Sequence, residues 1–184
     1  MRLVLLALFL ILQTSSAMAA ELTEQSIRDI YKQSADLATG KTVDAEKNMA
    51  FLKKHLTEDV ILNITMNVNV LEEPIVTHIN KEEAIKTTGE SYRKIRDSES
   101  RVEISSIDIA ESRQEATVKH KVFQDGVIHE EAQNGNKVKL SYQSISTCTD
   151  LLIVNKEIIQ WPKSSCNTNV IYGTPEIVKI DHDL

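Results

Sequence analysis

Aromatic residues, glycine and proline are all scarce in this chain of 184 residues, and these shortages exclude several classes of protein. Aromatic residues make up 4% of the chain, which argues against a stacking platform for single-stranded nucleic acid. The five glycines are dispersed and form no phosphate-binding loop. The net charge is −6 and no basic stripe occurs, so a nucleic-acid partner is not expected.

The histidines also lack a pattern that points to chemistry. None of the five stands at a metal-ligand spacing from another, and no H-E-x-x-H motif occurs. No cofactor fingerprint is present either. We therefore expect no metal ion and no cofactor.

Long hydrophobic runs are missing except at the N-terminus. Residues 1–20 place Arg2 before an apolar run of about ten residues and end in small residues, which is the layout of a secretory signal peptide. The alternative, a membrane anchor, needs about 20 apolar residues. We expect cleavage after Ala19 or Ala20, no membrane span in the mature chain, and a secreted or periplasmic protein. The net charge then becomes −7, because Arg2 is lost while all 27 acidic residues remain.

Only two cysteines are present, Cys148 and Cys166, with 17 residues between them. In an exported chain this pair predicts one disulfide, which would stabilise the fold by roughly 3 kcal/mol. The alternative is two buried thiols. A catalytic cysteine is disfavoured because neither residue has a histidine nearby in sequence.

The helical segments can be read from apolar spacing and from caps. Asn80 is placed to cap a helix, with Glu83 reaching back to it. Gly40 is expected to end the first helix. The predicted buried faces are Ile27, Ile30, Tyr31 and Ser34 in the first helix, Ala45, Met49, Leu52 and Leu56 in the second, and Ile85, Thr88, Tyr92 and Ile95 in the third.

The remaining segments alternate with a period of two and predict strands. A change of parity near Ser105 and Ser106 indicates a bulge. The dipeptides Asp125–Gly126 and Asn134–Gly135 are typical of turns. The predicted strands cover residues 60–70, 75–79, 101–109, 116–122, 138–154 and 157–172.

The last two predicted strands decide whether the cysteines can meet. If Val154 pairs with Glu157 across the turn, Cys148 faces Lys163 and not the second cysteine. A bulge at Pro162 would bring the two sulfur atoms together. The tail at residues 175–184 is acidic at its end and is expected to fray.

Helices, a long strand, a capped helix and a strand meander make an α+β order, and it resembles the NTF2-like superfamily. This is the cone fold of nuclear transport factor 2, ketosteroid isomerase, scytalone dehydratase and the SnoaL-like cyclases. The passages that carry the resemblance are 51–60, 80–85, 115–118 and 146–159, and it spans about residues 24–172.

The resemblance implies N-terminal helices packed in a strongly curved, mostly antiparallel sheet, with the domain at residues 21–174. It also implies a conical cavity that holds a small apolar ligand, an active site or only side chains. Members pair through the outer face of the sheet, so a homodimer is expected.

Four side chains are candidates for acid–base work. His120 shares a strand face with apolar residues and can act as a general acid or base, or it is a core histidine with one hydrogen bond. Tyr142 can bind a developing enolate, or it is a wall residue. Asp150 can supply the partner carboxylate of such a site if it faces inward, and otherwise it is solvated. Asp59 starts a strand and is a site residue or a loop acid. The predicted pocket lining is His120, Tyr142, Val118, Val122, Leu140 and Tyr92.

Three functions are consistent with the sequence. The leading one is a non-enzymatic exported domain that binds a small apolar ligand or a protein partner. The alternatives are an isomerase- or dehydratase-like enzyme and an accessory component of an envelope or secretion assembly. A cluster of His120, Tyr142 and a carboxylate that opens into a pocket would favour the enzyme. A closed cone with an exposed apolar strand face would favour partner binding.

Overall fold

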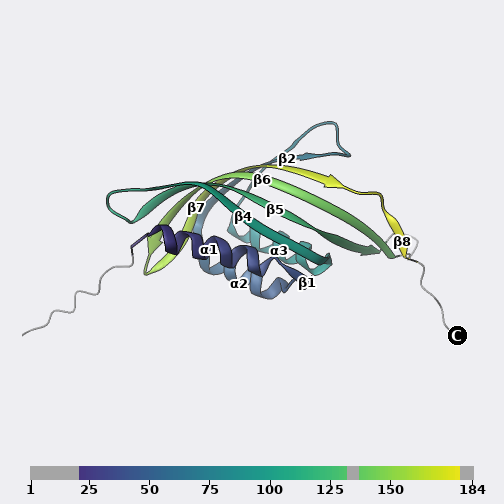
Figure 1. Cartoon of the computed structure of the whole chain (residues 1–184), viewed down its shortest axis with the longest axis horizontal. Coiled ribbons are helices and arrows are strands. Elements are labelled where there is room, and N and C mark those ends of the chain that lie inside the picture. Colours follow the sequence, from purple (N-terminus) through teal and green to yellow (C-terminus); the bar gives the residue numbers. More distant parts are fainter. Residues whose placement is uncertain (1–20, 132–136, 179–184) are drawn as a thin grey trace, which may run out of the picture.

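The computed structural model describes residues 21–131 and 137–178. One curved sheet arches over three helices, all of which lie on its concave side (Figure 1). The elements are α1 (Glu24–Leu37), β1 (Gly40–Thr42), α2 (Ala45–His55), β2 (Leu56–Val68), β3 (Ile75–Ile79), α3 (Lys81–Lys94), β4 (Ile95–Ile109), β5 (Glu115–Glu131), β6 (Lys137–Asn155), β7 (Ile158–Tyr172) and β8 (Glu176–Val178).

The strand order in the sheet is β1-β4-β5-β6-β7-β2-β3, and β8 pairs with β6. Every described pairing is antiparallel except that of β2 with β7. The predicted α+β class and mostly antiparallel sheet are therefore confirmed. The predicted signal peptide and the Asn134–Gly135 turn lie outside the described residues. Within the described part of the chain, no helix has the length and apolar character that spanning a membrane requires.

Capping chemistry sets where the helices begin. Asn80 accepts a hydrogen bond from the backbone N–H of Glu83, whose side chain accepts one from the N–H of Asn80, so the predicted capping box is confirmed. A second capping box, between Thr23 and Ser26, starts α1. That helix ends at Leu37, three residues before the predicted Gly40, which begins β1 instead.

The buried face of α2 differs from the predicted one. Met49 and Leu52 are only half-buried, whereas Asn48, Phe51 and His55 are buried. The two polar residues have partners that make burial tolerable. The Asn48 amide donates to the carbonyl oxygen of Leu37, and His55 Nδ1 lies 2.8 Å from a strand carbonyl oxygen.

Four strands, β2, β4, β5 and β6, are longer than the sequence pattern predicted, whereas β3 has the predicted bounds and β7 is one residue shorter. β4 begins at Ile95 and not at Arg101, although its bulge at Ser105 is confirmed by the register shift between Ile104 and Ser106. The predicted Asp125–Gly126 turn is wrong, because both residues lie inside β5. Gly126 instead allows the backbone of β5 to lie close to the Tyr142 ring, because a Cβ atom at this position would lie 3.2 Å from that ring.

The start of the C-terminal segment forms a strand that was not predicted. Its residues Glu176–Val178 form β8, which pairs with Lys137–Lys139 of β6. The backbone hydrogen bonds of this short ladder hold the start of the segment that was expected to fray.

The disulfide between Cys148 and Cys166 is confirmed, although the predicted turn register is wrong. Asn155 pairs with Ile158, because Lys156 and Glu157 both take positive φ angles and close a two-residue hairpin turn. The ladder then shifts opposite Trp161 and Pro162, at the predicted bulge. Together the tight turn and the bulge place the two cysteines directly opposite each other.

Removing the disulfide should lower stability without undoing the fold. The Cys148→Ala/Cys166→Ala variant loses a constraint on the unfolded chain, and we expect its free energy of unfolding to fall by about 3 kcal/mol. Urea unfolding monitored by Trp161, the only tryptophan, measures this change. A dithiol reductant should shift the natural chain to the midpoint of the variant and leave the variant unchanged. An unaltered midpoint in the variant would contradict the prediction.

Candidate functional site

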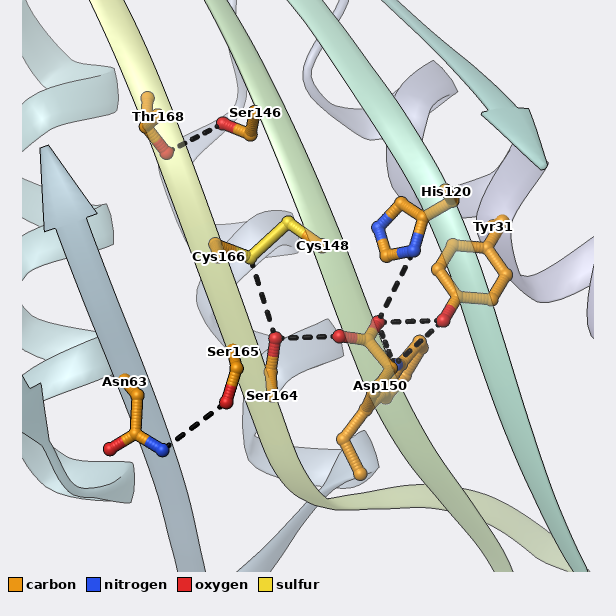
Figure 2. Close-up of a disulfide and its surroundings, with 11 residues drawn as sticks. Tyr31, Asn63, His120, Ser146, Cys148, Asp150, Ser164, Ser165, Cys166 and Thr168 are labelled. Atoms are coloured by element: carbon orange, nitrogen blue, oxygen red, sulfur yellow. Dashed lines mark hydrogen bonds and ion pairs between the residues drawn. A yellow bond between two sulfur atoms is a disulfide. The ribbon is translucent and has the colours of Figure 1, made fainter. Parts of the chain in front are cut away.

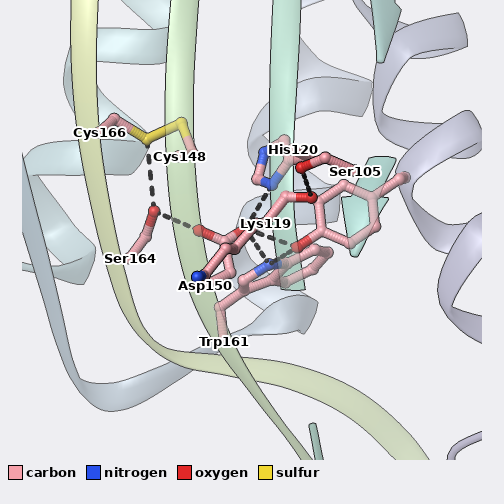
Figure 3. A network of polar contacts seen from close by, with 9 residues as sticks. Ser105, Lys119, His120, Cys148, Asp150, Trp161, Ser164 and Cys166 are labelled. Atoms are coloured by element: carbon pink, nitrogen blue, oxygen red, sulfur yellow. Dashed lines mark hydrogen bonds and ion pairs between the residues drawn. A yellow bond between two sulfur atoms is a disulfide. The ribbon is translucent and has the colours of Figure 1, made fainter. Parts of the chain in front are cut away.

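The centre of the concave side is a buried carboxylate, Asp150 of β6. Its side chain accepts three hydrogen bonds: from the Tyr31 hydroxyl at 2.6 Å, from Trp161 Nε1 at 3.0 Å and from the Ser164 hydroxyl at 2.6 Å (Figure 3). Asp150 is only 4% exposed. Burial of a carboxylate is costly unless donors surround it, and here they come from one helix and from the neighbouring strand.

Local structure explains why these donors converge. Tyr31 lies on the buried face of α1, which the apolar spacing predicted. Ser164 lies directly opposite Asp150 in the β6–β7 ladder. Trp161 and Ser164 have opposite parity in β7, so both reach the concave side only because the bulge lies between them.

His120 lies beside this carboxylate but does not bond to it. His120 Nδ1 is 3.8 Å from Asp150 Oδ2 and has no hydrogen-bond partner among the described residues. The imidazole is 4% exposed, and its centroid is 4.6 Å from that of the Tyr31 ring. Burial lowers the pKa of His120, and the negative charge of Asp150 opposes this shift only in part. The imidazole is therefore neutral at neutral pH.

The Tyr31 hydroxyl keeps its proton for the same reasons. Burial is the largest cause that raises the pKa of Tyr31 well above its ordinary value, and the charge of Asp150 adds to it. Tyr31 is thus a fixed donor to the carboxylate. Its position makes it a link between α1 and the sheet.

The disulfide lies next to this network (Figure 2). Cys166 Sγ is 3.5 Å from the Ser164 hydroxyl oxygen, and Cys148 is directly opposite His120 in the β5–β6 ladder. The covalent bond between β6 and β7 therefore fixes their register where they present Asp150 and Ser164. Two further cross-strand hydrogen bonds, Ser146 to Thr168 and Asn63 to Ser165, lie in the same region.

Of the four predicted acid–base candidates, the structure brings only His120 and Asp150 together. Tyr142 lies eight residues from Asp150 along β6, about 26 Å for an extended strand. It packs in a separate apolar cluster with Val43 and Ile95, where burial raises the pKa of its hydroxyl to about 12. Asp59 is exposed on β2 and has no place in the network. The cluster of His120, Tyr142 and a carboxylate that would have favoured the enzyme alternative is therefore not formed by the described residues.

The six residues predicted to line a pocket are also dispersed. Val118 is fully buried in the main core, Tyr92 packs with Tyr142 in the second cluster, and Val122 and Leu140 are half-buried. Four hollows among the described residues include only one of the six in their lining, Tyr142. The hollow nearest the Asp150 network is a groove of about 390 Å³ between α1 and β4, to which Tyr31 contributes.

Three members of the network were not predicted as site residues: Tyr31, Trp161 and Ser164. Two of them, Tyr31 and Trp161, have a partial signal in the sequence. A buried tyrosine or tryptophan needs a hydrogen-bond partner for its polar atom, and Trp161 precedes the proline of the predicted bulge. In the described ranges no group of three His, Cys, Asp or Glu residues is arranged to hold a metal ion.

Comparisons with known proteins show the fold. The Kfla4162 protein from Kribbella flavida is similar with a TM-score of 0.52 and 11% identity, covering 83% of this chain and 91% of that protein. An NTF2-like protein of unknown function from Shewanella baltica gives a TM-score of 0.46 and 14% identity, covering 80% of this chain and 97% of its own. A putative scytalone dehydratase from Novosphingobium aromaticivorans gives a TM-score of 0.46 and 14% identity, and the match covers 85% of each chain.

No protein-family model matches the sequence, and no curated protein matches it. The class of the chain is therefore defined by its architecture: it has the NTF2-like cone fold, with three helices in the concave side of a curved sheet. At this level of identity the likeness is one of fold, and the function must be argued from this chain's own residues.

Replacing Asp150 tests the network. In Asp150→Asn an NH2 group, which cannot accept a hydrogen bond, replaces one carboxylate oxygen, so at least one of the three donors loses its acceptor. We expect a loss of about 1–3 kcal/mol in the free energy of unfolding and a shift in the fluorescence emission of Trp161. Asp108→Asn, on the exposed side of β4, is the matched control and should change neither quantity. Equal stabilities of the two variants would contradict this account of Asp150.

Acid should destabilise the fold through its buried histidines. Burial lowers the pKa of both His55 and His120, so below pH ~6.5 the unfolded chain binds more protons than the folded one. The free energy of unfolding should therefore fall as the pH drops from about 6.5, by up to about 1.4 kcal/mol per pH unit for each histidine.

Urea unfolding at a series of pH values measures this slope. His120→Gln should flatten it, whereas the exposed His129→Gln control should not. A slope that is the same in all three proteins would show that His120 is not the group responsible.

Proposed function

We propose that this chain is an exported, non-enzymatic NTF2-like domain that acts by binding protein, and that it pairs with a second copy of itself through the convex face of its sheet. The single observation that carries the proposal is the contrast between the two faces of the sheet. The concave side is filled by helices and a satisfied polar network. The convex side is bare of helices and exposes apolar residues (Figure 1).

The concave side offers little to a substrate. A general acid or base must come within hydrogen-bond reach of the proton that it transfers. Tyr31, His120 and Asp150 are each 4% exposed, and the carboxylate already accepts three hydrogen bonds. These observations favour a binding role over the isomerase- or dehydratase-like alternative.

The convex face carries an apolar patch of three residues, Phe123, Ile145 and Ile171. Phe123 of β5 lies directly opposite Ile145 of β6, and Ile171 lies on β7 beside them. Ile145 and Ile171 are 45% and 57% exposed. A shallow hollow of about 340 Å³ runs over the patch, and the Arg101 guanidinium lies 3.9 Å from the Phe123 ring centroid. Exposed apolar residues that gather in this way favour an interface.

The charges beside the patch suit a second copy. Along the convex side of β5 the order is Lys119, Lys121, Phe123 and Asp125, and the three charged residues are exposed. A two-fold axis through Phe123 would place Lys121 of each copy against Asp125 of the other. Opposite charges at the two ends of a self-complementary patch favour an antiparallel pairing of sheets.

Two features support the proposed export of the chain. The signal-peptide layout of residues 1–20 supports export, and a disulfide is typical of proteins outside the cytoplasm. The proposed partner is therefore a second copy of this chain in the same compartment.

The oligomeric state tests the proposal. The mature chain should be a dimer by native mass spectrometry and by light scattering, and Ile145→Lys should convert it to a monomer because a charge would be buried in the interface. Ile177→Lys, which alters a more exposed isoleucine on β8 (67% against 45%), is the control and should remain a dimer.

A charge swap tests the orientation of the pairing. Lys121→Asp and Asp125→Lys should each weaken the dimer, and the two together should restore it. A monomer in the natural chain at all concentrations would overturn the proposal. A retained small molecule in protein purified from its own host would favour the ligand-binding alternative instead.

A further inference from the structure

The outer edge of β4 is paired along only part of its length. At its start, Arg96 and Ser98 pair with Thr42 and Gly40 of β1. One step further, the backbone N–H of Ser100 donates to the Thr39 hydroxyl at 3.0 Å, so a side chain takes the place of a strand. Beyond Ser100 the described residues provide no further partner on this side of β4.

Strand geometry shows where the next free groups point. The N–H of Ser100 faces away from β5, and the β4–β5 ladder runs without a register shift from Glu99 to Ile104. In an antiparallel pair every second residue turns both its N–H and its C=O outward. Val102 and Ile104 therefore present two N–H and two C=O groups at the free edge, about 7 Å apart along the strand.

This free edge forms one wall of a groove, and α1 forms the other. The groove between α1 and β4 has a volume of about 390 Å³. Val102 and Ile104 line it from the strand, and Tyr31 and Ala35 line it from the helix. In Figure 1, α1 runs beside β4 along this side of the molecule. The groove therefore combines apolar side chains with unpaired backbone groups.

The basic side chains around the groove are already paired within the chain, and the carboxylate of Asp29 accepts a hydrogen bond from the Gln25 amide at 2.7 Å. Arg28 pairs with Glu24, Lys32 with Asp36, and Arg101 with Glu103. Because each of these basic side chains has an acidic partner, the rim does not favour an ionic occupant. The groups that remain without a partner at the groove are the outward backbone N–H and C=O groups of β4 and the apolar side chains beside them.

We propose that the α1–β4 groove is a binding site for an extended, uncharged segment of a partner polypeptide, which adds to β4 as a new edge strand in line with β1. Its backbone pairs with Val102 and Ile104, and its alternate apolar side chains pack between the strand and α1. A small apolar molecule would leave the free backbone groups unpaired, whereas an extended backbone satisfies them at the spacing of the strand. Arg101 borders both this groove and the hollow over the convex patch. The backbone groups of Val102 and Ile104 face the sheet edge and not the convex face, so binding of the segment does not depend on dimer formation.

Amide exchange in the full mature chain tests this site. The probe is a short acetylated peptide of alternating valine and threonine. On its addition, the exchange of the Val102 and Ile104 amide hydrogens should slow by about tenfold or more, because the N–H groups become bonded. A copy of the peptide with methylated backbone nitrogens is the matched probe and should give no protection, and this comparison uses the natural protein.

Two variants separate this site from the convex patch. Val102→Pro removes an N–H that faces outward, which an edge strand tolerates, and it should abolish binding of the peptide while Trp161 emission is unchanged. Ile145→Lys should leave peptide binding intact even where it breaks the dimer. The proposal is overturned if the peptide does not bind, if the methylated peptide binds equally well, or if protection appears on the convex face instead.

Discussion

The hydrogen bonds to Asp150 are the interaction on which the rest of the structure depends. A buried carboxylate destabilises a fold unless donors compensate for its lost hydration. Here the compensation needs α1 docked in the cone, because Tyr31 supplies one donor, and it needs the bulge in β7, because Trp161 supplies another. One side chain, Asp150, thus depends on the position of the first helix, on the register of the last hairpin and on the closure of the cone.

This network has a direct consequence for function. The same contacts that satisfy Asp150 also remove it and His120 from solvent, and Tyr31 separates them from the groove between α1 and β4. This closure of the cone supports the two binding surfaces that we propose, the bare convex face and the free edge of β4. Through its lowered pKa, the buried histidine couples the stability of the fold to pH.

The sequence was most informative where structure is local. The capping box at Asn80, the alternation in β2, the bulge at Ser105 and the disulfide were all predicted, because each depends on residues close in sequence or on few alternatives. The site was predicted only in part. Tyr31 and Asp150 are 119 residues apart, and their contact depends on how a helix docks, which apolar spacing does not determine. The same limit explains the error in α2, where contact with Trp161 makes Phe51 a buried residue.

A single irregularity in β7 determines what the two faces of the sheet can do. Strand alternation would place Trp161 and Ser164 on opposite faces, and an indole on the convex side would enlarge the apolar patch and leave Asp150 with one donor fewer. Because of the bulge at Trp161 and Pro162, the side chains of Trp161 and Ser164 both point to the concave side. The disulfide then holds the shifted register a few residues further along. The polar interior and the open exterior therefore have one origin: a bulge fixed on one side by a tight turn and on the other by a covalent bond.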